Sequence, residues 1–326
     1  MHGADDQPVH WLDSCYGYPM KTFIRIAEVW VPTADGASLE LSSGLFPDAR
    51  AFEVMTRQMI FARGEGLPGR SWDQGHPIMM RELSGTYFKR AAAARAIDLT
   101  CAVALPVFQD RQLRCVVVLL MGGALSSIGT VELWHNDARI GPDLSLAEGY
   151  FGSSPKAAEL EALTRDGWLP RGTGIPGLAW QKGQAICVSD VAESRHFLRK
   201  ELAQAIGIGR AMAMPCSPKG TDTWVFSLLS AEETPVALRT EVWRKHTSSK
   251  NKLTLSGGFC EQQGHLADGT THSIEAPSPI AEAWRTAVAQ AQFLTEDKAP
   301  APGIASVLAM PVLVDDVLEE VVALYF

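Results

Sequence analysis

The sequence predicts an α+β fold of repeated antiparallel β-sheet modules with flanking helices, and two observations predict it. First, several short stretches recur at intervals of about one hundred residues, which indicates repeated structural units. Second, each repeat contains short apolar segments, turn residues and amphipathic segments in the same order. Strands that are joined by tight turns and interrupted by helices are typical of antiparallel sheets that carry helices on a face.

The most distinctive repeat is rich in glycine. Residues 64–72 read GEGLPGRSW and residues 172–180 read GTGIPGLAW, so three glycines, a proline and a tryptophan return 108 positions later. Two further tripeptides recur at similar intervals: Glu-x-Trp starts at Glu28, Glu132 and Glu241, and Ala-x-Pro starts at Ala104, Ala213 and Ala309. The spacing indicates three copies, of which the third lacks the glycine-rich segment and keeps only Trp284.

These repeats set the expected module boundaries. We expect an N-terminal extension over residues 1–22, a first module over 23–124, a second over 128–232 and a degenerate third over 237–326. The segments between the expected modules are only a few residues long. Direct packing of the three modules on one another is therefore expected.

Turn residues mark the ends of the expected elements. Asp35-Gly36 is a strong hairpin signal between strands at 23–31 and 37–46. Ser154-Pro155 begins a helix at 156–165, because proline suits the first helical position. Further strands are expected at 77–83 and 185–191, further helices at 86–97, 193–206 and from Ser278-Pro279 to about 293, and closing hairpins at 101–108 with 113–121, 211–217 with 223–229, and 306–314 with 318–326.

Both glycine-rich segments also match G-x-G-x-x-G, the dinucleotide-binding pattern. That pattern requires a helix that begins at the last glycine and belongs to a βαβ unit. Gly75 and Gly183 follow too soon for such a helix, and the next strands begin near Ile78 and Ile186. We therefore interpret each segment as a tight turn whose tryptophan packs into the core below it.

The order of these motifs resembles the GAF domain family. In the first copy the resemblance runs from Glu28 to Gly122 and includes Phe88-Lys89-Arg90; in the second it runs from Glu132 to about residue 231 and includes Phe197-Leu198-Arg199. The third copy is similar only at its ends. The resemblance implies a GAF/PAS-like module, in which a small molecule is often held between the sheet and the loops above it. Known ligands of the family include cyclic nucleotides, bilins, haem and small metabolites, and many members hold nothing and dimerise.

Composition excludes several classes of function. The net charge is −8 and the chain has no block of lysine or arginine, so nucleic acid is not an expected partner. The longest apolar run is far shorter than the ~20 residues of a membrane helix. The first residues lack the basic start and apolar stretch of a secretory signal, and six cysteines are scattered without paired spacing. A cytoplasmic protein with reduced thiols is expected.

Candidate ligand-binding residues are those that differ between the copies or flank the Phe-x-x motif. The tryptophans recur at equivalent positions, which indicates packing rather than a shared ligand. The expected ligand-binding residues are Met80, Glu82, Tyr87 and Phe88 in the first copy and Cys187, Asp190, His196 and Phe197 in the second. No catalytic residue, metal site or cofactor is predicted, and homo-oligomerisation is left open.

The leading hypothesis is a non-enzymatic sensory or regulatory protein that binds a small molecule or a partner protein and signals through a separate partner. One alternative is a structural or assembly subunit without a ligand. Another is an enzyme that resembles free methionine sulfoxide reductase and uses thiols such as Cys101 or Cys187. Cys260, His265 and His272 could supply three zinc ligands, but a polar loop without a metal is the favoured interpretation.

Overall fold

The computed structural model describes residues 22–83, 87–122, 128–152, 155, 157–217 and 222–326. Residues 1–21 of the predicted N-terminal extension and the predicted helix-start residue Ser154 lie outside the described residues. No helix in the described ranges is both long and apolar enough to cross a bilayer.

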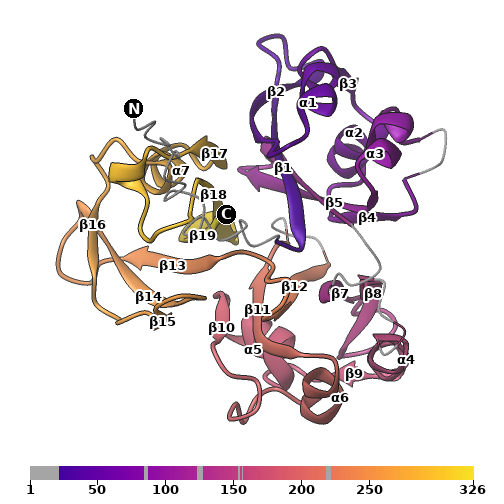
Figure 1. Ribbon diagram of the computed structural model, residues 1–326, viewed down its shortest axis with the longest axis vertical. Coiled ribbons are helices and arrows are strands. Elements are labelled where there is room, and N and C mark those ends of the chain that lie inside the picture. Colours follow the sequence, from indigo (N-terminus) through magenta and orange to yellow (C-terminus); the bar gives the residue numbers. More distant parts are fainter. Residues whose placement is uncertain (1–21, 84–86, 123–127, 153–154, 156, 218–221) are drawn as a thin grey trace, which may run out of the picture.

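Three antiparallel sheets with the same strand order make up the structure (Figure 1). The first sheet has the order β3-β2-β1-β6-β5-β4, the second β10-β11-β12-β7-β8-β9, and the third β15-β14-β13-β19-β18-β17, with β16 paired to β14. The first contains β1 (Ile24–Pro32), β2 (Ser38–Leu45), β3 (Ile60–Ala62), β4 (Ile78–Arg81), β5 (Leu99–Gln109) and β6 (Gln112–Gly122). The second contains β7 (Gly129–Asn136), β8 (Leu144–Tyr150), β9 (Trp168–Leu169), β10 (Ile186–Val188), β11 (Ile208–Pro215) and β12 (Thr223–Ala231). The third contains β13 (Arg239–Lys245), β14 (Lys252–Cys260), β15 (Gly264–His265), β16 (Thr271–Ser273), β17 (Gln290–Phe293), β18 (Ser306–Val314) and β19 (Val317–Tyr325). The predicted fold class of repeated antiparallel α+β modules is confirmed.

The strand register repeats as well as the strand order. In each sheet the glutamate of Glu-x-Trp lies opposite a glycine, and the pairs are Glu28 with Gly44, Glu132 with Gly149, and Glu241 with Gly258. A β-bulge then falls just before the tryptophan in all three. Because a bulge re-aims the side chains that follow it, the three tryptophans point the same way relative to their sheets. Trp30, Trp134 and Trp243 are all buried, as the packing interpretation predicts.

The interpretation of the glycine-rich segments as turns is wrong. They form the helices α2 (Gly66–Gln74) and α5 (Gly174–Lys182), each ended by a glycine with positive φ, Gly75 or Gly183. The last glycine of each pattern, Gly69 or Gly177, allows close packing, because an added Cβ would lie 2.1 Å from the Ala62 carbonyl oxygen or 2.5 Å from that of Pro170. The tryptophans at the ends of these helices are only partly buried. All described strand pairs are antiparallel, so the motif does not lie in a dinucleotide-binding βαβ unit.

Of the other predicted helices, the one at 156–165 forms as α4 (Ala157–Asp166) at nearly the predicted bounds, and three others are shorter than the sequence pattern suggests. The first module has α1 (Arg50–Arg57) and α3 (Ala91–Ala96), the second has α4 and α6 (Lys200–Ala205), and the third has α7 (Pro279–Thr286) and the 3₁₀ turn η1 (Glu296–Lys298). Of the predicted helices at 86–97 and 193–206, only the second halves are helical among the described residues, as α3 and α6. The predicted helix that begins at Ser278-Pro279 ends at Ala287, whose φ is +53°, and its last residues form β17.

Each sheet buries both of its faces. One face of each packs under its own helices, around Trp30, Trp134 or Trp243. The opposite faces of all three sheets meet in one shared apolar core, to which β5, β6, β12, β18 and β19 contribute (Figure 1). Burial on both faces explains why these strands are almost continuously apolar, where a half-exposed antiparallel sheet would alternate. Direct packing of the modules, expected from the short linkers, is what the structure shows.

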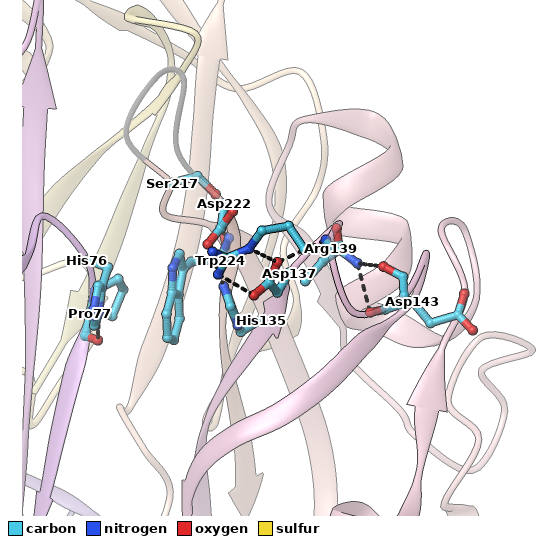
Figure 2. A network of polar contacts seen from close by, with 11 residues as sticks. His76, Pro77, His135, Asp137, Arg139, Asp143, Ser217, Asp222 and Trp224 are labelled. Carbon is cyan, nitrogen blue, oxygen red and sulfur yellow. Dashed lines mark hydrogen bonds and ion pairs between the residues drawn. The ribbon is translucent and has the colours of Figure 1, made fainter.

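A stack of three rings joins the first two modules (Figure 2). The Trp224 indole of β12 lies between the imidazoles of His76 and His135, with ring centroids 4.7 Å and 4.3 Å apart. His76 belongs to the first module and the other two rings to the second, so the stack crosses the junction. The Asp222 carboxylate lies 3.4 Å from the Nε2 atom of His135, so a carboxylate lies beside the His135 end of the stack.

Candidate functional site

Residues of the repeated motifs form a buried polar network in the first module. Trp30 donates its indole N–H to Glu28 (2.9 Å) on the same strand, and the Arg90 guanidinium pairs with both oxygens of that carboxylate. Arg90 also donates to the Thr56 hydroxyl (2.7 Å). Glu28 and Thr56 are fully buried, and Arg90 is 2% exposed. A buried ion pair of this kind requires additional hydrogen bonds to be tolerated, and the indole and hydroxyl supply them.

The second module contains the same network from the equivalent residues. Trp134 donates to Glu132 (2.9 Å), and Arg199 donates to Glu132 (2.6 Å) and to the Thr164 hydroxyl (2.5 Å). Here the arginine side chain is 13% exposed rather than 2%. The third module keeps the pairing of Glu241 with Trp243 (2.8 Å), but its arginine comes from the same strand, at position 239.

Arg199 is more exposed because it lines an apolar cavity of about 210 Å³. The cavity lies between the second sheet and the segments above it, which is where the resemblance to GAF domains places a ligand. Its floor is formed by the sheet and the Arg199–Glu132 pair, and its walls come from α4, β9, α5 and the segment before α6. Its lining residues include Trp134, Leu163, Trp168, Leu169, Ile175, Phe197, Leu198, Arg199 and Leu229. An apolar hollow with a few polar groups at one point is typical of small-molecule sites.

The equivalent space in the first module is filled by aromatic rings. Phe61 pairs with Leu39 just as Leu169 pairs with Leu144, so the two residues are equivalent in register. The Phe61 ring packs edge-on against Trp30 at 4.8 Å and is 2% exposed. Leucine at the same position of the second module leaves the space beside Trp134 empty.

The mouth of this cavity is apolar. Leu163, Trp168 and Leu198 are about half exposed, and all three line the cavity. Large apolar side chains that gather at one exposed point mark an interaction site more often than scattered ones do. The cavity in the second module is therefore the first candidate for a ligand site.

A second cavity, of about 170 Å³, lies at the junction of the second and third modules. Strands β10, β11 and β12 form one side, and β13, β14 and the loop after β14 form the other. Arg210 and Glu261 face each other across it, with Arg210 Nη2 3.0 Å from the carboxylate. Burial raises the pKa of Glu261 to about 7, opposed by Arg210 and assisted by Glu232.

The predicted ligand-binding residues divide between these cavities and other places. Phe197 lines the cavity of the second module and Cys187 lines the junction cavity. The remaining six line neither of the two: Met80, Glu82, Tyr87, Phe88, Asp190 and His196. Of these, Phe88 is buried in the core and Tyr87 is 64% exposed, where the Arg70 guanidinium covers its ring at 5.1 Å.

The other four predicted residues, Met80, Glu82, Asp190 and His196, lie in a strand or in turns and loops. Met80 is partly buried against the core of the first module. Glu82 has a positive φ of +63° and donates its backbone N–H to the Thr100 carbonyl oxygen. Asp190 is exposed and accepts from the Ala192 backbone N–H (2.8 Å), and His196 is exposed. The contacts of Glu82 and Asp190 are those of turn residues, whereas Met80 lies in β4.

The sequence signal for this network is the recurrence of its residues in both modules. Arg90 and Arg199 end the two Phe-x-Arg tripeptides, and Thr56 and Thr164 recur 108 positions apart. An arginine, a glutamate and a threonine that recur together predict a shared polar network. Arg210 and Phe259 carried no such signal, because their contact joins different modules.

Four of the described thiols are unsuited to nucleophilic chemistry in this state: those of Cys101, Cys115, Cys187 and Cys216. Burial raises the pKa of Cys115 and Cys187 to about 12, and it raises those of Cys101 and Cys216 further. Since the thiolate is the nucleophile, these groups are protonated at neutral pH. Among the described residues, no three His, Cys, Asp or Glu side chains are grouped to hold a metal ion, and His272 Nε2 instead contacts the Ser278 hydroxyl (2.6 Å).

No protein-family model matches the chain, and no curated protein matches it. Several solved structures are similar to about one third of it. A GAF domain of A. aeolicus in an inactive state has 14% identity over 31% of this chain and 59% of its own, with a TM-score of 0.25. A free methionine-R-sulfoxide reductase from Neisseria meningitidis in complex with its substrate has 21% identity over 33% and 53%, with a TM-score of 0.24. A GAF domain/HD domain protein from Geobacter sulfurreducens has 16% identity over 30% and 64%, with a TM-score of 0.25.

The strand order and register described above define modules with a GAF-like fold. This chain spans little more than half the length of the first two of those structures. What the similar proteins bind or catalyse belongs to those proteins.

Proposed function

We propose that this chain is a non-enzymatic regulatory protein that binds a small, largely apolar molecule in the cavity of its second module. The observation that carries the proposal is the difference between two equivalent spaces. The first module fills this space with Phe61, whereas the second has Leu169 and a cavity of about 210 Å³ whose mouth is apolar. A cavity of about 150 Å³ in a protein core can hold a ligand the size of benzene.

Arg199 is the charged side chain that lines this cavity. Its guanidinium is held by Glu132 and Thr164, so it presents a fixed cation to a ligand atom that accepts a hydrogen bond. Ligand occupancy would stabilise the segment at 197–199 and α4, which form the opposite walls. Ligand binding would thus make these wall segments more ordered. We propose that a separate partner protein recognises this change.

A thiol-dependent reductase finds less support. The buried thiols are protonated, and Cys101 lies in the core while Cys187 lies at the junction cavity, outside the cavity of the second module. Replacement of Cys101 or Cys187 by serine tests this alternative. Loss of methionine sulfoxide reduction in either folded variant would support the enzyme.

The binding proposal is tested by filling the cavity. Leu169→Phe copies the residue that fills the first module, so the variant is expected to fold. A small molecule that raises the melting temperature of the native chain should not raise that of Leu169→Phe. The matched control is Leu39→Ile in the first module, where the Phe61 ring packs against Trp30, and it should leave the ligand response intact. An unchanged response in Leu169→Phe would remove the proposed site.

A further inference from the structure

The cavity between the second and third modules is a separate feature with its own chemistry. Three junctions join the modules in a ring, in which β4 lies against β8, β10 against β14, and β17 against β2. The first two can be compared residue by residue, because their strands share one register. The junction of β10 with β14 contains a cavity of about 170 Å³.

Two glycines leave this junction more open than the junction between the first and second modules. Between the first and second modules, the hydroxyls of Thr100 and Tyr150 are 2.8 Å apart and close the contact. At the second junction Gly209 stands in place of Thr100, so this hydroxyl contact is lost, and Phe259 stands in place of Tyr150. Two residues before Phe259, Gly257 stands where the first junction has Glu148. A Cβ added to Gly209 would meet nothing within 4 Å, and one added to Gly257 would meet only Cys187 at 4.0 Å.

Arg210 brings an incompletely paired cation to the cavity. It occupies the position of Cys101 in the first module, and its guanidinium lies over the Phe259 ring at 3.9 Å. Its Nη2 atom is paired with Glu261 (3.0 Å). Its Nε and Nη1 atoms are buried, and neither has an acceptor among the described residues. A buried donor without an acceptor is unfavourable, and an acceptor bound in the cavity would relieve this.

The rest of the lining combines negative charge with apolar surface. Glu261 lies in the wall, and Asp268 lines the exposed edge of the cavity beside His265. Buried side chains on the opposite side provide the apolar surface: Met212, Leu228 and Val236. A simple anion would meet these carboxylates and a simple cation would meet Arg210, so neither fits the whole lining.

A ligand that carries both charges and an apolar group does fit it. We propose that this junction cavity binds a free amino acid with an apolar side chain. Its carboxylate accepts hydrogen bonds from the unpaired nitrogens of Arg210, its ammonium group faces Glu261 and Asp268, and its side chain contacts Met212 and Leu228. Charge-assisted bonds to arginine favour a carboxylate over a neutral acceptor. Because the ligand contacts both modules, it would fix their junction.

Calorimetric titration of the full chain tests this proposal directly. The probes are leucine, isoleucine, valine and methionine, each compared with the amine that lacks its carboxylate and the acid that lacks its ammonium group. At least one amino acid should bind, and both of its analogues should bind at least about tenfold more weakly. Failure of all four to bind at millimolar concentration would overturn the proposal. Equal binding of an acid analogue or of acetate would also overturn it, since the site would then be a general anion site.

Variants locate the binding on the chain. Arg210→Gln and Glu261→Gln should each weaken amino acid binding at least about tenfold. Arg81→Gln is the matched control, because Arg81 lies at the other junction and pairs with Glu161 at 2.7 Å. If Arg210→Gln does not fold, Gly257→Leu fills the cavity at an open position and should abolish binding. Undiminished binding in either folded variant would contradict the assignment. Leu169→Phe should leave amino acid binding unchanged, which separates this site from the one proposed in the second module.

Discussion

Phe61 and Leu169 lie at the same register position of two equivalent sheets, and they leave different amounts of space beside the buried tryptophan. The Phe61 ring packs on Trp30, whereas Leu169 and Trp134 line an open cavity. The polar network below is the same in both modules, so the difference concerns the space above it. Retention of the network with loss of the ring is what a ligand-binding copy beside a purely structural copy would show.

Exchange of these two residues should move the cavity between modules. Phe61→Leu creates a hollow in a core that has no ligand to fill it, and the free energy of unfolding should fall by about 1 kcal/mol or more. Leu169→Phe fills an existing hollow and should leave stability unchanged or raise it. Urea denaturation monitored by tryptophan fluorescence measures both. A large loss of stability in Leu169→Phe would mean that the cavity cannot accept the ring.

The buried Glu28–Arg90 pair should be more sensitive to disruption than its exposed counterpart. Arg90→Met leaves the Glu28 carboxylate uncompensated in the core and should cost about 3–5 kcal/mol. Arg199→Met should cost less, since water can reach Glu132 through the cavity beside Arg199. The double variant Glu28→Gln with Arg90→Met should recover part of the loss. Chemical denaturation provides the comparison, and equal costs at the two arginines would argue against the role of burial.

The ring stack across the first junction should couple the two modules. His76 and Trp224 stack with planes 7° apart (Figure 2), and aromatic pairs of this kind contribute about 0.5–1.5 kcal/mol beyond their buried area. A double-mutant cycle of His76→Ala and Trp224→Leu should therefore give a coupling energy in that range. Strict additivity of the two substitutions would show that the stack does not contribute.

Glu261 should make stability depend on pH near neutrality. Burial raises the pKa of its carboxyl to about 7 in the folded state, from an ordinary value of 4.5. The folded chain therefore binds more protons than the unfolded chain between these values, and the free energy of unfolding falls as the pH rises through this range. The loss is complete about one unit above pH 7 and amounts to roughly 3 kcal/mol.

Glu261→Gln removes the titrating group and should remove that part of the pH dependence. The informative quantity is the difference between the native chain and the variant, because other carboxyls titrate alike in both. The decrease in melting temperature from pH 5 to pH 8 should be smaller in the variant than in the native chain. The same slope in both proteins would show that Glu261 titrates normally.

The sequence predicted those features that depend on local pattern. The Asp35-Gly36 turn and the three closing hairpins are where their turn residues and apolar runs indicate. Repetition also identified Trp30, Trp134 and Trp243 as core residues, whereas Trp72, Trp180 and Trp284 are only partly buried. The helix at α2 could not be predicted from its composition, because glycine and proline have low helix propensity. Its stability comes from packing, above all where Gly69 meets the Ala62 carbonyl.

The ligand-binding residues were harder to predict for a related reason. The prediction selected positions that differ between copies, and of these Asp190 and Tyr87 are exposed. Phe61 and Leu169 also differ, at the same 108-residue offset as the glycine-rich segments, but the space that each leaves beside its tryptophan depends on three-dimensional packing. The contact of Arg210 with Phe259 depends on how two modules meet, and no local pattern encodes it.

The most direct test of the central claim is native mass spectrometry of the freshly purified chain beside its Leu169→Phe variant. The account predicts an additional mass that is released on denaturation, is present on the native chain and on Gly257→Leu, which fills the junction cavity instead, and is absent from Leu169→Phe. A mass that only Gly257→Leu removes belongs to the junction cavity. A bare native chain that no added small molecule stabilises, or an equal additional mass on Leu169→Phe, would contradict a ligand in the second module.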